Sequence, residues 1–255
     1  MNIHETAIIH EKAKIGKGVK IGPFTVIGEH VIIGDNTEIG SHVYLNWIEI
    51  ASDCKISQGV ISGGSPQALK YKDCPSFIKI GSNNIIREFV TIHRSMMENN
   101  ATVVGDGNYI MAYAHIAHDC KIGNETIITS YTGLSGHVIV EDKAVIGGAA
   151  GIHQFVRIGR LSMIGGMSRV VKDVPPYFLV EGNPAEPRGL NVVGLRRNQI
   201  PPDIRDNLKR VFKLLYQSDL NTSQAIENIK KEVTWGEEVK YLVEFIERSQ
   251  RGVIK

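Results

Sequence analysis

Four of the nine histidines in the 255-residue sequence lie close together in one stretch of the chain. They are His115, His118, His137 and His153. A neutral imidazole can remove a proton from an attacking nucleophile, and it is also a common metal ligand. Asp119 directly follows His118, and a carboxylate beside an imidazole can orient it. This stretch is therefore a candidate catalytic or metal site, and its use depends on how the chain positions it.

An aliphatic residue recurs at every sixth position over most of the chain. From Ile3 to Leu45 and from Val104 to Val170, the 20 positions at this spacing hold 15 Ile, 3 Val and 2 Leu. A helix cannot keep such a repeat on one face, whereas a short flat strand followed by a turn can. Three such units make a triangular coil of about 18 residues, and stacked coils form a parallel β-helix. We expect the Gly or Asn that follows many of the aliphatics to supply the permissive corner.

The coil converts sequence positions into spatial neighbours, because residues about 18 apart lie one strand spacing above one another. Gly136 should therefore lie directly above His118, and His137 above Asp119. A glycine leaves open space over the imidazole, and its backbone N–H can stabilise an oxyanion. Three interpretations stay open: general-base catalysis, a zinc site of His115, His118 and His137 as in a γ-type carbonic anhydrase, and polar side chains that simply face water.

The chain changes structural type after Val170. Up to that residue Ile outnumbers Leu by 28 to 4, whereas beyond it the ratio is 6 to 8, and Leu favours helix where Ile favours strand. Three stretches of helical periodicity follow, near Pro201, after Asn221 and around Val239. The sequence predicts a mainly β protein, with a β-helix over residues 1–186 that carries the site. A small α-helical domain over residues 187–255 should cover the open end of the coil.

The overall composition argues against several classes of protein. The chain has 29 Lys and Arg against 27 Asp and Glu, and this formal charge of +2 is not typical of a nucleic-acid-binding protein. We expect no stable membrane insertion, because the N-terminus has no apolar leader and no stretch is long enough to cross a bilayer. Three cysteines without a CxxC pair fit a reducing compartment, so we expect a cytoplasmic protein.

The histidine stretch and several other segments resemble the UDP-N-acetylglucosamine acyltransferase family, which catalyses the first step of lipid A biosynthesis. The resemblance covers essentially the whole chain, and the segments that carry it are Asn108–Asn124 with the run AHIAHDC, Gly147–Phe155 with the run HQF, Ile21–Phe24, Pro66–Tyr71, Val90–Arg94, Asp173–Tyr177 and Gly182–Asn183. It implies a left-handed coil and a homotrimer. It also implies O-acyl transfer of an (R)-3-hydroxyacyl group from acyl carrier protein to the 3-position of UDP-N-acetylglucosamine. No metal and no cofactor are implied beyond the phosphopantetheine of the carrier protein.

The resemblance further implies a role for individual residues. His118 matches the family's general base, Asp119 the acid that orients it, and Gly136 the backbone donor to the oxyanion. The residues that match substrate-binding positions are Lys70, His93, His115, His137, His153, Gln154, Gly166, Asn191, Arg196 and Arg197. Among them, Gly166 matches the position that limits acyl length, and the arginines fall in the segment that meets the uridine diphosphate.

Two further features bear on the substrates. Residues 188–213 hold seven basic and two acidic residues, and this local charge of +5 suits docking of an acidic acyl carrier protein. Ala68 and Val193 stand where the family usually or often has an acid, the first of them close to the reacting sugar position. Loss of that acid fits an alternative acceptor, a UDP sugar with a 3-amino group, because an amine needs less activation than an alcohol.

Overall fold

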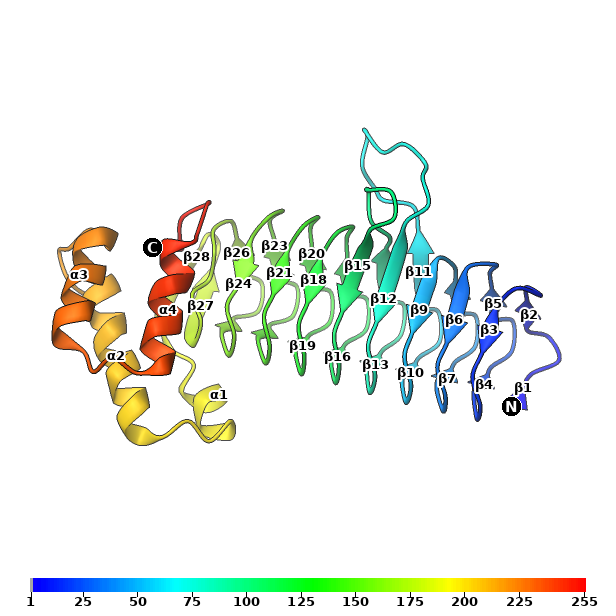
Figure 1. Cartoon of the computed structure of the whole chain (residues 1–255), viewed down its shortest axis with the longest axis horizontal. Coiled ribbons are helices and arrows are strands. Elements are labelled where there is room, and N and C mark those ends of the chain that lie inside the picture. The colour runs from blue at the N-terminus through cyan, green and yellow to red at the C-terminus, as the bar shows by residue number, and fades with distance from the viewer. Residues whose placement is uncertain (1) are drawn as a thin grey trace.

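The computed structural model describes residues 2–255, which form a long triangular coil of mostly parallel strands with a group of helices at one end (Figure 1). The coil is a left-handed parallel β-helix, as predicted, and its three flat sides are named here face A, face B and face C.

Each face is one sheet. Face A consists of β1 (Asn2–Ile3), β4 (Lys20–Ile21), β7 (Glu38–Ile39), β10 (Lys55–Ile56), β13 (Ile85–Ile86), β16 (Tyr109–Ile110), β19 (Ile127–Ile128), β22 (Val145–Ile146), β25 (Met163–Ile164), β27 (Phe178–Gly182) and β28 (Ala185–Leu190). Face B consists of β2 (Ile8–Ile9), β5 (Val26–Ile27), β8 (Tyr44–Leu45), β11 (Ile61–Gly64), β14 (Thr91–His93), β17 (His115–Ile116), β20 (Gly133–Leu134), β23 (Gly151–Ile152) and β26 (Arg169–Val170). Face C consists of β3 (Lys14–Ile15), β6 (Val31–Ile33), β9 (Ile48–Ile50), β12 (Phe77–Ile80), β15 (Ala101–Val104), β18 (Lys121–Ile122), β21 (Ile139–Val140) and β24 (Arg157–Ile158).

Successive coils stack in the predicted register. On face B, His115 pairs with Gly133, and Gly133 pairs in turn with Gly151. The repeated aliphatic residues point to the axis, where Ile128 and Ile146 have no exposed surface. Burial of one such side chain contributes roughly 1.5–3 kcal/mol. The six-residue repeat therefore supplies the core as well as the geometry of the coil.

The repeated glycines have a different purpose from the one expected. Positive φ at the corners is taken up by other residues, such as Asp119 at 60° and His137 at 61°. The glycines that follow the aliphatics lie where neighbouring coils approach most closely, so that a Cβ at Gly22 would lie 2.8 Å from the carbonyl oxygen of Gly40. The prediction that these glycines supply the permissive corner is therefore wrong, because coil spacing is what requires them.

Two insertions leave the coil at the edge between faces B and C. The first, residues 65–76, connects β11 to β12, and the second, residues 94–100, connects β14 to β15 one coil later. Figure 1 shows both loops projecting from the same side of the coil. The histidine stretch follows on the next coils of the same edge, so both insertions are placed to contact it.

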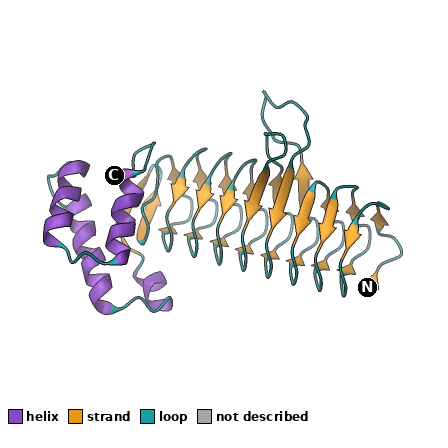
Figure 2. Ribbon diagram, in the orientation of Figure 1, coloured by secondary structure: helices purple, strands orange, loops and turns teal. Residues whose placement is uncertain are grey.

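Four helices follow the coil: α1 (Val192–Arg197), α2 (Pro202–Tyr216), α3 (Thr222–Glu232) and α4 (Glu237–Glu247) (Figure 2). The last three match the predicted helical stretches, and a capping box of Asn221 and Gln224 starts α3. The short helix α1 was not predicted. The boundary predicted at residue 186 lies inside β28, which pairs with β27 and continues face A up to Leu190.

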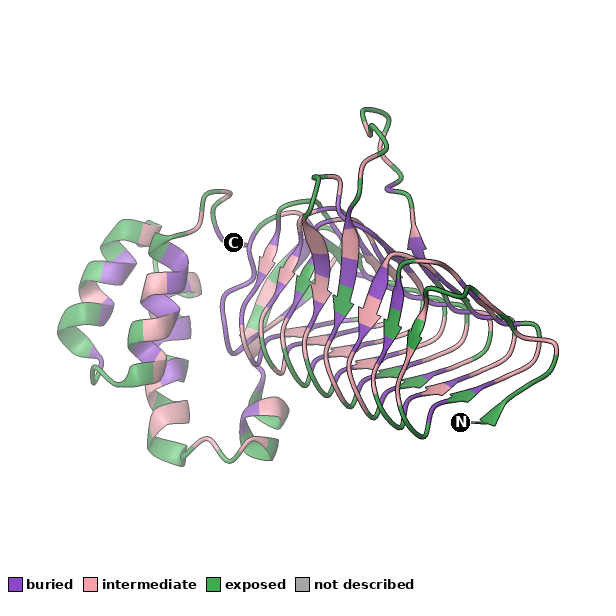
Figure 3. Cartoon of the chain, turned by 45° about the vertical axis from the view of Figure 1, so that its right-hand side comes forward, coloured by how far each residue is buried: buried purple, intermediate pink, exposed green. Residues whose placement is uncertain are grey.

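The helices are fixed to the last coils and have a core of their own. Tyr241 of α4 donates a hydrogen bond of 2.6 Å to Glu141, and Val253 forms a β-bridge with Asp173. Buried residues line the inside of the coil and the facing sides of the helices (Figure 3). Within residues 2–255, none of the helices has both the length and the apolar character needed to span a membrane.

Candidate active site

The histidine stretch lies on the edge between faces B and C, at the corners that follow β17, β20 and β23. There Gly136 stacks on His118, and His137 stacks on Asp119 in the neighbouring column. The N–H of His137 donates to the carbonyl of His118 at 3.0 Å, and the N–H of Phe155 donates to the carbonyl of Gly136 at 3.1 Å. The columns predicted from the 18-residue coil are therefore present.

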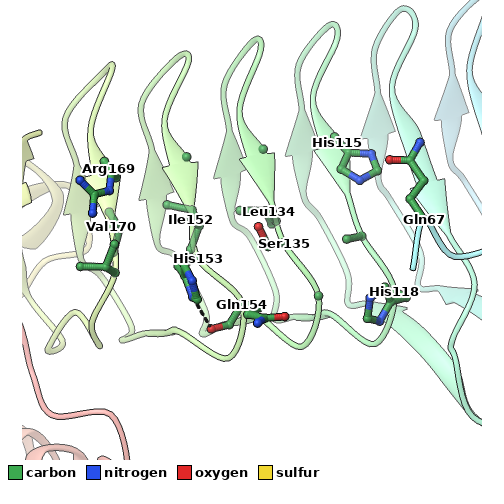
Figure 4. A pocket seen from close by; sticks show the side chains of 15 residues that line it. Gln67, His115, His118, Leu134, Ser135, Ile152, His153, Gln154, Arg169 and Val170 are labelled. Carbon is green, nitrogen blue, oxygen red and sulfur yellow. Dashed lines mark hydrogen bonds between the residues drawn. The ribbon is translucent and has the colours of Figure 1, made fainter. Parts of the chain in front are cut away.

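A groove of about 650 Å³ runs along face B beside this edge (Figure 4). Two glycines keep it open, because a Cβ at Gly133 or Gly151 would meet nothing within 4 Å. The other residues that line it are Gln67, His115, Ala117, His118, Leu134, Ser135, Gly136, Ile152, His153, Gln154, Arg169, Val170 and Val171. The groove thus combines apolar walls, suited to an acyl chain, with histidines at one edge.

Four donors hold the carboxylate of Asp119. Oδ1 accepts hydrogen bonds from the Ser95 hydroxyl and, at 3.3 Å, from the Asn100 amide. Oδ2 accepts from the backbone N–H of Met96 at 3.1 Å and lies 2.9 Å from Nδ1 of His118. Burial opposes the charge, but the hydrogen bonds from Ser95, His118 and Met96 outweigh it and lower the pKa of Asp119. The carboxylate is therefore charged at neutral pH and fixed in direction.

The ring of His118 is held on one side and open on the other. Because Nδ1 faces the Asp119 carboxylate, it carries the proton, which leaves Nε2 as the acceptor. Gly136 lies directly over the ring, so that a Cβ at this position would come within 2.7 Å of Nε2. Among residues 2–255 the N–H of Gly136 donates to no backbone acceptor. An unpaired acceptor and an unpaired donor thus lie side by side at the edge of the groove.

The neighbouring histidines are kept neutral. Burial lowers the pKa of His115, with repulsion from His118 adding to it, and Thr91 holds its Nδ1 at 2.7 Å. Burial also lowers the pKa of His137, an effect that Asp119 opposes and His118 reinforces. His137 stacks on Phe155 with a centroid distance of 4.6 Å and meets His118 edge to face. Their charge is therefore suppressed beside the ring that would accept a proton.

His93 lies below His115 and is the most strongly shifted of these histidines. Burial, aided by repulsion from His115, lowers its pKa to about 4. The unfolded chain has an ordinary pKa of about 6.5 for this group. The unfolded state therefore binds more protons between these two values, and stability falls as the pH drops through that window.

Replacing His93 with glutamine should reduce the loss of stability on acidification. From pH 7 to pH 5, His93 should account for about 1–2 kcal/mol of the drop in unfolding free energy. The measurement is chemical denaturation at the two pH values, with His10→Gln as a control at an exposed histidine. Equal losses in His93→Gln and the unsubstituted protein would contradict the assignment.

The residues suited to a metal differ from the set of His115, His118 and His137 suggested by the sequence. In the described part of the chain, the only group that could hold an ion is His118, Asp119 and His137, whose ligand atoms lie within 4.8 Å of one another. His115 is not part of it and contacts Thr91 instead. Since donors already surround both oxygens of Asp119, an ion would have to displace them.

The predicted substrate-binding residues are only partly brought together. His115, His153 and Gln154 line the groove, His137 lies across the edge from it, and His93 lies beneath His115. The residues that do not line it are Lys70, Gly166, Asn191, Arg196 and Arg197. The side chain of Asn191 is also engaged elsewhere, since it caps α1 through the N–H of Gly194 and donates to the carbonyl of Leu161. These two hydrogen bonds of Asn191 orient α1, the helix that carries Arg196 and Arg197.

Several residues around the site were not predicted. Ser95 and Met96 hold Asp119, Gln67 enters the groove from the first insertion, and Arg251 approaches Nδ1 of His153 at 3.3 Å. The two insertions interrupt the repeat at the edge where the site lies, and that interruption was the available signal for the first three. For Arg251 no signal exists in the sequence, because the fold of the helical tail brings it back to the coil.

The chain matches family models in both of its parts. Residues 12–46 and 101–136 match the bacterial transferase hexapeptide repeats, and residues 173–254 match domain 2 of UDP-N-acetylglucosamine O-acyltransferase. Together with a groove that holds a carboxylate-bound histidine, the coil defines the chain as a hexapeptide-repeat transferase.

Individual relatives narrow this class. The acyl-[acyl-carrier-protein]–UDP-N-acetylglucosamine O-acyltransferase of Burkholderia lata is 46% identical over 211 residues, which cover 81% of this chain and 80% of the relative. The crystal structure of UDP-N-acetylglucosamine acyltransferase from Bacteroides fragilis matches with a TM-score of 0.96 at 38% identity over 99% of both chains. That of Francisella novicida gives 0.93 at 40% identity, over 99% of this chain and 93% of the other. The chain belongs to the UDP-N-acetylglucosamine O-acyltransferase family.

Proposed function

We propose that this protein transfers an (R)-3-hydroxyacyl group from acyl carrier protein to the 3-hydroxyl of UDP-N-acetylglucosamine, the first step of lipid A biosynthesis. The observation that carries the proposal is the stack of Asp119, His118 and Gly136 at the edge of an apolar groove. The names of the relatives, which specify acyl carrier protein and UDP-N-acetylglucosamine, supply the substrates.

In the proposed reaction Nε2 of His118 takes the proton of the sugar hydroxyl as its oxygen attacks the thioester carbon. The negative charge that develops on the carbonyl oxygen lies close to the N–H of Gly136, which has no backbone partner in residues 2–255. The carbon–sulfur bond then breaks, and the leaving phosphopantetheine thiolate receives the proton from His118. Asp119 keeps the imidazole in one tautomer and stabilises its transient positive charge. The steps use protein groups alone.

The test is incubation with UDP-N-acetylglucosamine and a series of (R)-3-hydroxyacyl carrier proteins, with mass analysis of the products. A product heavier by one hydroxyacyl group, formed only with the carrier-bound donor, is the expected result. A parallel reaction with the 3-amino analogue of the sugar examines the alternative acceptor suggested by Ala68. That alternative is not favoured, because the relatives are named as O-acyltransferases.

A homotrimer is part of the proposal. The outward-facing residues of face B are almost all uncharged, with Arg169 the single exception. Faces A and C instead present charged residues such as Lys20, Glu38 and Lys121. Ile61 on face B is 48% exposed, and an exposed apolar row of this kind favours contact with another copy. The groove lies on the same face, so assembly would enclose it. Assembly would also bring residues of a neighbouring copy, such as Arg196 and Arg197 of its α1, towards the groove.

Replacing Ile61 with lysine should therefore weaken assembly. A charge placed in an apolar subunit contact loses hydration without gaining a partner, so the trimer should dissociate at micromolar protein concentration. Light scattering coupled to gel filtration measures the molar mass. Ile85→Lys on face A, at a position 38% exposed, is the matched control and should leave the mass unchanged. Equal masses for both variants would remove face B as the contact.

The carrier protein is proposed to dock on residues 188–213. Of the basic residues there, Arg196, Arg197, Lys209, Arg210 and Lys213 are exposed, and within residues 2–255 they form no ion pair. Unpaired cations of this kind attract an acidic partner over the distance of a Debye length. A cytoplasmic location also remains a proposal, supported by the three free cysteines, Cys54, Cys74 and Cys120.

A further inference from the structure

Arg94 is a buried cation at the base of the two insertions. Its side chain is 6% exposed, although its residue type is rarely buried without a specific partner. Nη1 donates to the carbonyl of Cys74 at 2.6 Å, and Nη2 donates to the hydroxyl of Ser65 at 3.3 Å and to the carboxylate of Asp73. All three partners belong to the first insertion, residues 65–76. Arg94 therefore ties the two ends of that loop to the coil.

Aromatic side chains enclose the guanidinium group as well. It lies 5.2 Å from the ring centroid of Trp47 and 5.6 Å from that of Tyr71. The Tyr71 hydroxyl donates to Asp73 at 3.1 Å, so the cation and its carboxylate partner are both held. Arg94 lowers the pKa of Asp73, through its hydrogen bond first and with help from Tyr71. A planar group with donors in a fixed fork suits this arrangement, whereas a lysine ammonium is a point charge on a flexible stem and does not match the fork.

The next residues in sequence hold the second insertion against the site. Ser95 and Met96 donate to the carboxylate of Asp119, and the carbonyl of Ser95 accepts a hydrogen bond of 2.6 Å from Ser76. The two loops are thus joined. The guanidinium group of Arg94 takes no part in the contacts to Asp119, which Ser95 and Met96 make. The first insertion carries Gln67, which enters the groove beside His115 (Figure 4).

We propose that Arg94 is a positioning residue that holds the first insertion over the groove and so places Gln67, and with it Lys70, for contact with the sugar nucleotide. This inference rests on the proposed function for its substrate. It assigns Arg94 no contact with the reacting atoms. Loss of the guanidinium group should loosen the loop and weaken substrate binding, while the dyad of His118 and Asp119 stays in place.

The test compares Arg94→Met and Arg94→Lys with Arg87→Met. Arg87 is also paired, with Glu88 and Tyr109, but it lies at a corner between faces A and B, away from the groove. In Arg94→Met the KM for the sugar nucleotide should rise about tenfold with kcat within about threefold, and Arg94→Lys should recover part of the difference. Gln67→Ala combined with Arg94→Met should be no worse than the single changes, because both remove the same contact.

A second measurement does not depend on activity. Lys70 and Lys72 are exposed in the loop, so trypsin should cut there about tenfold faster in Arg94→Met than in Arg87→Met or the unsubstituted protein. Unchanged cleavage with an unchanged KM would overturn the proposal, as would equal changes in both arginine variants. If the unsubstituted protein lacks acyltransferase activity, the proposed function fails, yet the cleavage experiment still decides whether Arg94 holds the loop.

Discussion

His118→Gln should lower the rate of acyl transfer by roughly 10³-fold while leaving the fold intact, because a positioned general base contributes about 10²-fold to 10⁴-fold. Glutamine approximates the size of imidazole but cannot accept and return a proton. His118 is 13% exposed and packs on the outside of the coil rather than in its core, so its replacement should cost little stability. The measurement is kcat with UDP-N-acetylglucosamine and the best carrier-bound donor.

Asp119→Asn is the companion variant and should lower kcat less, by roughly 10²-fold. The amide oxygen can accept a hydrogen bond from Nδ1 of His118, but the neutral amide no longer stabilises the imidazolium, and the NH₂ that then replaces Oδ1 is a donor facing Ser95 and Asn100. Circular dichroism and molar mass should match the unsubstituted protein in both cases. Retention of more than a tenth of the original kcat by His118→Gln would remove it as the base.

Gly136→Ala should reduce kcat about 10²-fold to 10³-fold, although it adds only one methyl group. The new Cβ would overlap the His118 ring, so the ring or the corner must move. Displacement of a catalytic group by about 1 Å can cost roughly 10²-fold. The methyl group would also crowd the N–H that is proposed to face the oxyanion.

Gly133→Ala is the matched control for this change. It lines the same groove on the same coil as Gly136, and its Cβ would meet nothing within 4 Å. Its kcat should stay within about tenfold of the original, since the methyl group occupies groove space without touching the imidazole. If both glycine variants lose activity equally, the groove is being filled, and the specific overlap with His118 is not the cause.

Much of this geometry could be predicted from the spacing of residues alone. A coil in which each turn repeats the last converts sequence distance into spatial distance, and so the 18-residue separation alone predicts Gly136 over His118. The same regularity predicted the buried aliphatic columns. It did not reveal why the glycines recur, because the six-residue pattern cannot separate a corner that needs positive φ from a site where two backbones come close.

The rest of the site escaped prediction because it depends on segments without a repeat. Gln67, Arg94 and Ser95 lie in or beside the insertions, whose path is determined by their own hydrogen bonds. Arg251 reaches His153 only because the tail folds back onto the last coils. The helix α1 was also missed, since a six-residue helix has too few positions to display a periodicity.

The triangular coil also restricts how such a chain can change in length during evolution. Addition of one whole turn far from the site would lengthen the protein and leave every downstream side chain on its original face. Insertion of a single strand and turn between His118 and Gly136 would shift each later residue to the next face and separate the two. Extra residues are tolerated only if they are extruded, as between Ser62 and Ile92, which still pair across the first insertion. The coil therefore keeps each residue on its face only as long as extra residues leave it at a corner. Loops extruded in this way can then supply new contacts with the substrate.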